Sequence, residues 1–243
     1  MDEHYLSRLR GEQPQDAVDI WHLDLNFDHA RWNALTEDER SRARKIKIIE
    51  KRVQFVAGRS QLRHILASYL RSRPADIELE YGDHGKPFIR SGPPLSFNLS
   101  HSHSAGLLVV TAADDVPLGV DIELCSPGRR FVPLAQRFFS EAEYQDLNAK
   151  PADEVADAFY RTWACKEAYL KACGTGLSFP SNQFTVRCHP DRKTELLASQ
   201  MPGQPGPWHF HPIVTTGDYA ASVCYSGERR WLRHFFPLKE SGS

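Results

Sequence analysis

The segment Gly119-Val120-Asp121-Ile122-Glu123 has the alternation around which the rest of this chain can be read. In a strand, side chains at i and i+2 share a face, so Val120 and Ile122 would enter a core while Asp121 and Glu123 project together. Two adjacent carboxylates repel, and a hard cation such as Mg²⁺ would relieve the repulsion. A strand with one solvated face has the same pattern, and the segment alone does not separate the two interpretations.

A second charged motif lies downstream, in the segment Trp163–Lys171 (WACKEAYLK). On a helix, Glu167 and Lys171 are four residues apart and share a face. A carboxylate beside a lysine suits a site for a cation and a phosphate, because the acid takes the metal and the ammonium meets a phosphate oxygen. The alternative is a surface ion pair that contributes about 0.3 kcal/mol.

Two turn-like motifs upstream carry further polar candidates. Ser100-His101-Ser102 and the following His103 leave a predicted strand. An H-x-H pair can ligate zinc, but no further ligands stand at a suitable spacing, and Ser100 and His101 can instead donate hydrogen bonds to phosphate or cap a plain turn. Gly85-Lys86-Pro87 holds a lysine in a tight turn. The chain has no Walker-type loop and no G-x-G-x-x-G motif.

Around these motifs, the patterns predict an α+β protein of two similar halves. Each half reads as a strand, then helices, then several strands. One helix, or two joined near Gly58, is expected from Thr36 to Pro74, and other helices at Pro133–Phe139, Ser140–Leu147 and Asp153–Cys173. Strands are expected at Val18–Leu25, Ile77–Tyr81, Pro87–Ile89, Leu95–Asn98, Leu107–Thr111, Leu118–Glu123, Phe184–Cys188, Trp208–Ile213, Tyr219–Cys224 and Trp231–Phe236.

The charge of the 243-residue chain is balanced overall but segregated along the sequence. Thirty Lys and Arg against 31 Asp and Glu give a formal net charge of −1, which argues against nucleic-acid binding through overall basicity. Residues 36–73 nevertheless contain eleven basic and four acidic residues, and residues 114–160 contain four and ten. This asymmetry predicts a basic surface for an anion and an acidic region for a metal or a basic partner, or else two solvated helical faces.

The cysteines and the N-terminus indicate a cytoplasmic protein. The five cysteines are odd in number and scattered, so neither a disulfide framework nor a cysteine zinc site is expected. The N-terminus lacks the apolar core of a secretory signal, and no apolar run approaches the roughly 20 residues that span a bilayer.

In their order and spacing, these motifs resemble the 4′-phosphopantetheinyl transferases of the surfactin-synthetase-activating type. The family's marks are a G-K-P turn, an S-H-S element, a G-[IV]-D-[IV]-E strand, an F-F-S-x-x-E-Y segment and a W-x-x-K-E-[AS]-x-x-K helix. They stand here at Gly85–Pro87, Ser100–Ser102, Gly119–Glu123, Phe138–Tyr144 and Trp163–Lys171. The resemblance implies a monomer with the family's pseudo-dimeric α+β fold, which we divide into subdomains at residues 1–115 and 116–243, the second carrying the metal site.

The resemblance also implies an activity. Members of the family transfer the phosphopantetheine arm of coenzyme A to a serine of an apo acyl or peptidyl carrier protein and release adenosine 3′,5′-bisphosphate. By position, Asp121, Glu123 and Glu167 would hold Mg²⁺, or Mn²⁺ in its place. Asp121, Glu167 and Lys171 would be catalytic, with Glu167 the candidate acceptor of the serine proton.

Further positions are implied to bind the coenzyme. Ser100 and His101 would contact its 3′-phosphate region, and the remaining positions are Lys86, Lys166, Lys171, Arg42 and Arg59. Glu143 falls where some members have an acid near the site, and His103 falls where the family often has a small residue.

Two other functions use the same residues. A metal-dependent phosphohydrolase with the three acids would release phosphopantetheine or phosphate without any carrier protein. A non-catalytic module would bind a carrier protein or an anion through the basic segment, with no dependence on Mg²⁺.

Overall fold

The computed structural model describes residues 16–26, 29–89, 91–126, 128, 130–189, 192–201 and 206–236. The α-helices are α2 (Glu37–Lys45), α3 (Ile49–Leu70), α4 (Phe131–Phe138), α5 (Glu141–Asn148) and α6 (Val155–Cys173). The strands of the first half are β1 (Ala17–Asp24), β2 (Glu80–Tyr81), β3 (Pro87–Phe88), β4 (Ser96–Ser102) and β5 (Ala105–Thr111). The later strands are β6 (Leu118–Leu124), β7 (Phe184–His189), β8 (Arg192–Ser199), β9 (Trp208–Pro212), β10 (Tyr219–Ser226) and β11 (Trp231–Phe235).

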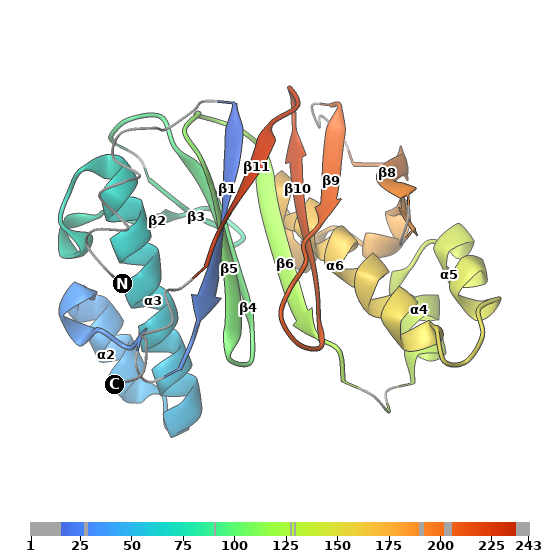
Figure 1. Cartoon of the computed structure of the whole chain (residues 1–243), viewed down its shortest axis with the longest axis horizontal. Coiled ribbons are helices and arrows are strands. Elements are labelled where there is room, and N and C mark those ends of the chain that lie inside the picture. Colours follow the sequence, from blue (N-terminus) through green and yellow to red (C-terminus); the bar gives the residue numbers. More distant parts are fainter. Residues whose placement is uncertain are drawn as a thin grey trace.

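Two sheets, each with a long helix, form the two halves of the molecule (Figure 1). The first sheet has the order β11-β1-β5-β4 and packs with α3, and the second has the order β6-β10-β9 and packs with α6. This arrangement confirms the predicted α+β class.

Side chains rather than a backbone ladder join the two sheets: β1 and β5 share a buried apolar core with β6 and β10, and polar contacts link β4 to β6. Asn98 Oδ1 of β4 accepts a hydrogen bond from the Val120 amide of β6 at 2.9 Å, and Ser102 Oγ accepts one from the Leu124 amide at 3.2 Å. Both donors lie in β6, which we call the acidic strand because it carries Asp121 and Glu123. The strand that carries Asp121 and Glu123 is therefore held directly against β4 of the other half.

Most predicted elements are present, and their ends differ by no more than four residues. Both capping boxes are formed, at Thr36 with Glu39 and at Ser140 with Glu143. The break between α2 and α3 lies at residues 46–48 and not at Gly58, which is inside α3. The break is stabilised because the Arg52 guanidinium donates to the carbonyl of Ile46.

Two strands differ from the expectation. A strand was predicted at Ile77–Tyr81, and the observed strand β2 contains only the last two of these residues, Glu80 and Tyr81. β8 was not predicted, because its pairing with β7 is interrupted by two register shifts, which disturb the alternation of apolar residues.

The last strand crosses the division between the halves. β11 pairs in parallel with β1, and Arg233 of β11 donates to both carboxylate oxygens of the buried Asp19 at 2.6 and 2.8 Å. This strand lies within the expected C-terminal subdomain, residues 116–243, and pairs with the sheet of the N-terminal half.

The helix α6 lies unusually close to the acidic strand. Its buried alanines Ala164, Ala168 and Ala172 repeat every four residues along one face. A Cβ atom added at Gly119 of β6 would lie 2.1 Å from the Ala168 carbonyl oxygen and 2.4 Å from the Ala172 nitrogen. The glycine is thus required for the approach that brings α6 over Asp121.

Gly119→Ala is expected to destabilise the fold by about 3 kcal/mol or more, because the colliding atoms belong to the helix backbone and cannot rotate away. Urea unfolding measures the change. Gly58→Ala is the matched control, since its Cβ would meet Leu25 at an ordinary 3.6 Å and alanine favours the helix by up to about 1 kcal/mol. Equal stability of the two variants would contradict the close packing.

Acid is expected to weaken the pairing of β1 with β11 through His22. Its Nε2 lies 3.2 Å from His234 Nδ1, and burial, then the charge of His234, lowers its pKa to about 4. The unfolded chain, with a pKa near 6.5, binds more protons below that pH, so stability falls as the pH drops from about 6.5 to about 4.

The variant His22→Gln removes this titration. Relative to wild type, we expect it to gain on the order of 2 kcal/mol between pH 7 and pH 4, a value reduced from the full shift because the ring is partly exposed. Unfolding curves across this range measure it, with the exposed His84→Gln as control. Parallel curves for His22→Gln and wild type would exclude a role for His22.

Candidate functional site

The predicted acidic site lies where β4, β6 and α6 meet. Asp121 and Glu123 come from β6, Ser100 from β4, and Glu167 and Lys171 from α6. These residues are up to 71 positions apart in the sequence, which is the separation of Ser100 and Lys171. The tertiary fold brings them together at the junction of the two halves.

Asp121 is the centre of this cluster. Its carboxylate is buried, and Oδ1 accepts hydrogen bonds from Lys171 Nζ at 2.6 Å and from Ser100 Oγ at 2.9 Å. Lys171 Nζ also donates to Ser100 Oγ at 2.8 Å, which closes a triangle. Within the described residues, Asp121 Oδ2 is buried and has no hydrogen-bond partner. One carboxylate oxygen is therefore left for a group that the chain does not supply.

Glu123 and Glu167 lie within the electrostatic reach of Asp121. Desolvation, followed by the charge of Asp121, raises the pKa of Glu123, whose carboxylate accepts a hydrogen bond from Ser102. The same two causes raise the pKa of Glu167 to about 7. Both shifts indicate that a cation between the acids would be favourable.

The residues fit a divalent cation in charge and donor chemistry. Hard cations prefer carboxylate oxygens, and the cluster offers the unpartnered Asp121 Oδ2 beside two further acids. No three His, Cys, Asp or Glu side chains in the described ranges already converge as a metal cage, and the Lys171 ammonium neutralises Asp121 instead. The structure therefore supports the donor set and not a preformed geometry.

A line of basic and aromatic side chains borders the acidic cluster. His101 is exposed, and partial desolvation, then the charges of Lys171 and Arg59, lower its pKa. Arg59 lies over the rings of Phe55 and Tyr81, at 5.8 Å from each centroid. Arg42 covers the same Phe55 ring at 5.4 Å. In the described part of the chain, the buried Arg59 Nη1 lacks a hydrogen-bond partner.

Lys86 reaches the site from the β2–β3 turn but does not face the acids. Its Nζ donates to the carbonyls of Leu118, Lys171 and Ala172, at 2.9, 2.8 and 3.3 Å. These three bonds use all the donors of the ammonium group. The predicted phosphate contact of Lys86 would have to displace one of them.

Lys166 lies on another face of α6, in the core. Its Nζ donates to both oxygens of Glu143, at 2.8 and 2.6 Å, and to the Phe184 carbonyl at 2.8 Å. The side chain is 2% exposed. The predicted coenzyme contact of Lys166 is not supported, because its ammonium group is buried and its three donors are all used in hydrogen bonds within the core.

The role of Glu143 follows from the same contacts. Besides binding Lys166, it completes the capping box of α5 and accepts a hydrogen bond from the Val186 amide at 2.7 Å. Glu143 therefore joins α5, α6 and β7, and it does not belong to the acidic site.

His103 is exposed and occupies the turn between β4 and β5. It has a positive φ of 53°, a conformation that costs little only for small or locally hydrogen-bonding residues. It makes a contact of 3.4 Å with Ser102 Oγ and none with the acids among the described residues.

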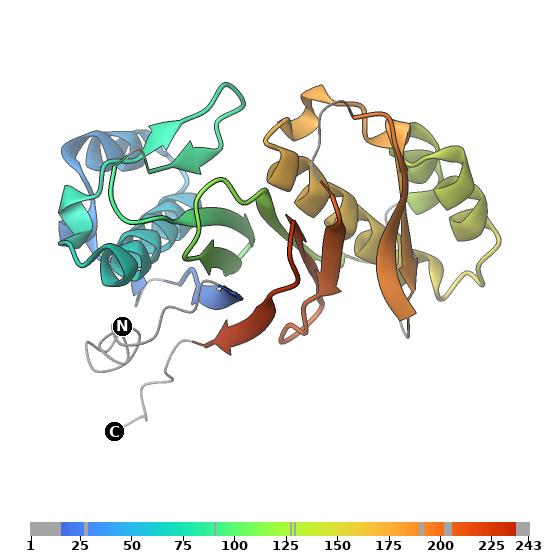
Figure 2. The ribbon, with the colours of Figure 1, turned by 90° about the horizontal axis from the view of Figure 1, so that it is seen from above.

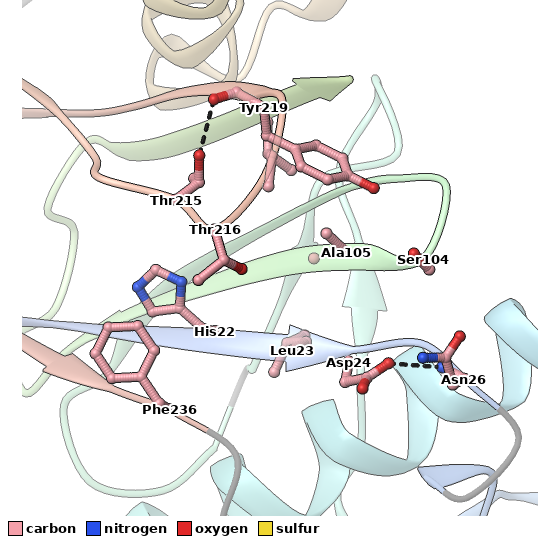
Figure 3. Close-up of a pocket in the computed structure, with 12 residues that line it drawn as sticks. His22, Leu23, Asp24, Asn26, Ser104, Ala105, Thr215, Thr216, Tyr219 and Phe236 are labelled. Atoms are coloured by element: carbon pink, nitrogen blue, oxygen red, sulfur yellow. Dashed lines mark hydrogen bonds between the residues drawn. The ribbon is translucent and has the colours of Figure 1, made fainter. Parts of the chain in front are cut away.

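A pocket of about 360 Å³ lies on the other side of this turn (Figure 3). The residues that line it include His22, Asp24, Ser104, Thr216, Tyr219 and Phe236. Ile122 also lines it, and in a strand its side chain points away from those of Asp121 and Glu123. The pocket is therefore separate from the acidic cluster.

Three residues of the site were missed in the sequence. Asn98 joins β4 to β6, and Phe55 and Tyr81 support Arg42 and Arg59. A polar Asn inside an apolar strand was the available signal for the first. The aromatic contacts depend on the packing of α3 against the β2–β3 hairpin and left no local signal.

None of the described helices is long and apolar enough to cross a membrane.

Lys166→Met is expected to destabilise the protein by about 3 to 5 kcal/mol, because it leaves the Glu143 charge buried without a partner. Urea unfolding measures the loss, and Lys150→Met, which breaks the surface pair of the half-buried Lys150 with the exposed Asp146, should cost less than about 1 kcal/mol. Calorimetry with coenzyme A should give an unchanged Kd for folded Lys166→Met. Weaker binding without lost stability would instead place Lys166 at the ligand.

Comparison with known proteins identifies the family of the chain. The family model for the 4′-phosphopantetheinyl transferase superfamily matches residues 117–224, which include Asp121, Glu123, Glu167 and Lys171. The 4′-phosphopantetheinyl transferase HetI of Nostoc sp. is 37% identical over 221 residues, 87% of this chain and 89% of that protein. The 4′-phosphopantetheinyl transferase Sfp of Bacillus subtilis is 33% identical over 190 residues, 78% of this chain and 81% of that protein. The chain therefore belongs to the 4′-phosphopantetheinyl transferase superfamily.

Proposed function

We propose that this protein transfers the 4′-phosphopantetheine arm of coenzyme A to a serine of an apo acyl or peptidyl carrier protein, in a reaction that depends on Mg²⁺. The serine oxygen forms a bond to the β-phosphorus. The bond from that phosphorus to the bridging oxygen breaks, and adenosine 3′,5′-bisphosphate leaves. The serine proton passes to a base of the enzyme.

One observation carries the proposal: Asp121 is buried against Lys171 and Ser100 and keeps an unpartnered oxygen at the junction of the two halves. In such a site, the Lys171 ammonium lies beside a carboxylate, and the second oxygen of that carboxylate has no hydrogen-bond partner among the described residues. Transfer of a phosphoryl group needs charge neutralisation and alignment more than covalent help from the protein. The cluster supplies these two requirements.

Each residue of the cluster has a proposed role. Lys171 contacts a phosphate oxygen. The 3′-phosphate region of the coenzyme is bound by Ser100, His101, Arg59 and Arg42. Glu167 accepts the serine proton directly or through a water, as a carboxylate general base. Mg²⁺ or Mn²⁺, held by Asp121, Glu123 and Glu167, would neutralise the pyrophosphate charge.

A monomer in the cytoplasm is the proposed working form. β4 of one half and β6 and α6 of the other line the site within a single chain, so a second copy is not needed to complete it. The cysteines in the described part of the chain are free, in keeping with a reducing compartment.

Asp121→Asn is expected to lower the transfer rate by at least about 1,000-fold, because it removes the charge that holds both the lysine and the cation. Mass spectrometry of an apo carrier protein incubated with coenzyme A and Mg²⁺ measures the transfer, and far-UV circular dichroism checks the fold. Asp153→Asn, at an exposed position, should leave the rate unchanged.

The same assay separates the alternatives. Release of phosphate or phosphopantetheine without a carrier protein would identify a phosphohydrolase. Carrier binding with no gain of mass, indifferent to Mg²⁺, would identify a non-catalytic module. Undiminished transfer by Asp121→Asn would contradict the proposed site.

A further inference from the structure

Lys86 occupies an unusual position between the two halves. It belongs to the β2–β3 hairpin, which extends from the N-terminal half toward the end of α6 (Figure 2). Its ammonium group donates three hydrogen bonds, all to backbone carbonyls of the C-terminal half. A lysine with three backbone acceptors has no remaining donor for a ligand.

The three acceptors belong to the two elements that carry the acidic site. Leu118 begins β6, three residues before Asp121, and Lys171 and Ala172 lie in the last turn of α6. The last carbonyls of a helix have no partner within the helix, and the negative end of the helix dipole attracts a cation. Lys86 therefore ties the end of α6 to the start of β6.

The turn around Lys86 is built to hold this position. Gly85 has a φ of 76°, which favours glycine, and its amide donates to the Gly82 carbonyl at 2.8 Å. The Gly82 amide donates to the Lys86 carbonyl at 3.0 Å, and Pro87 restricts the backbone that follows. The lysine backbone is thus fixed from both sides.

Partial burial of the Lys86 side chain is also consistent with a fixed structural role. Desolvation lowers the pKa of Lys86 to about 8, so the group is still mostly charged at neutral pH. Its charge is stabilised by carbonyl dipoles, and no carboxylate contacts Lys86 Nζ among the described residues.

We propose that Lys86 is a positioning residue, which clamps the last turn of α6 to the start of β6 and thereby sets the Lys171 ammonium against Asp121 and Ser100. It does not itself contact a phosphate. The kinetic consequences of this inference rest on the proposed transfer reaction, whereas its structural consequences do not.

Lys86→Met tests the clamp, and Lys51→Met, at an exposed position of α3, is the control for the loss of one lysine. In the carrier-protein assay, we expect Lys86→Met to lower kcat about 10- to 100-fold, since a misplacement of about 1 Å costs on the order of 100-fold. The KM for coenzyme A should change little. Should Lys86→Met fail to fold, Lys86→Gln, which keeps an amide donor, takes its place.

Binding of adenosine 3′,5′-bisphosphate separates the clamp from a phosphate contact. In a Lys171→Met background, where the route through Lys171 is absent, calorimetry should give a similar Kd with and without Lys86→Met. A Kd about tenfold weaker, equivalent to about 1.4 kcal/mol, would show that Lys86 holds a phosphate and would overturn the proposal.

A double variant tests whether Lys86 acts through Lys171. If it does, Lys86→Met should lower the residual kcat of a Lys171→Met enzyme by much less than it lowers that of wild type, because coupled residues are not additive. The same fold loss in both backgrounds would overturn this route.

Amide hydrogen exchange measures the clamp without any activity. Exchange in the last turn of α6, residues 170–174, should accelerate at least about tenfold in Lys86→Met and not in Lys51→Met. Unchanged exchange would overturn the clamp. A wild-type protein that shows no transfer, but in which Lys86→Met accelerates this exchange, would refute the proposed function and leave the clamp standing.

Discussion

The contact between α6 and β6 at Gly119 is the constraint on which the site depends. The strand has no side chain at this position, and α6 presents alanines to it, so the two backbones approach more closely than larger residues allow. Glu167 and Lys171 lie on the same helix, and this approach brings them over Asp121. A wider separation would break the contact of 2.6 Å between Lys171 and Asp121.

Two lysines of α6 show how one helix serves both core and site. Lys166 and Lys171 are five residues apart, which on an α-helix turns their side chains about 140° from one another. Lys166 is sealed against Glu143 and Phe184 and ties α6 to α5 and β7. Lys171 lies at the open junction, beside an acid with a vacant oxygen. The pair of Lys166 with Glu143 therefore stabilises the half of the molecule in which Lys171 meets Asp121.

The two sheets share a buried apolar core, in which side chains of β1 and β5 meet those of β6 and β10, and polar groups tie the halves together around the acidic site. Asn98 and Ser102 bind amides of β6, Ser100 binds Asp121, and Lys86 binds carbonyls of β6 and α6. Polar groups buried in this way are costly to leave unsatisfied. The N-terminal half therefore positions the acids of the C-terminal half as well as lining the site.

The sequence alone determined the elements and the chemistry of the acids. Alternation placed Asp121 and Glu123 on one face of a strand, helical spacing paired Glu167 with Lys171, and two capping boxes located helix starts. These signals are local, because they depend on the period of one element. Only the tertiary structure decided that Lys166 is enclosed in the core while Lys171 meets Asp121, that β11 returns to the first sheet, and that Lys86 binds carbonyls. Those outcomes depend on partners from distant segments, and no local period records them.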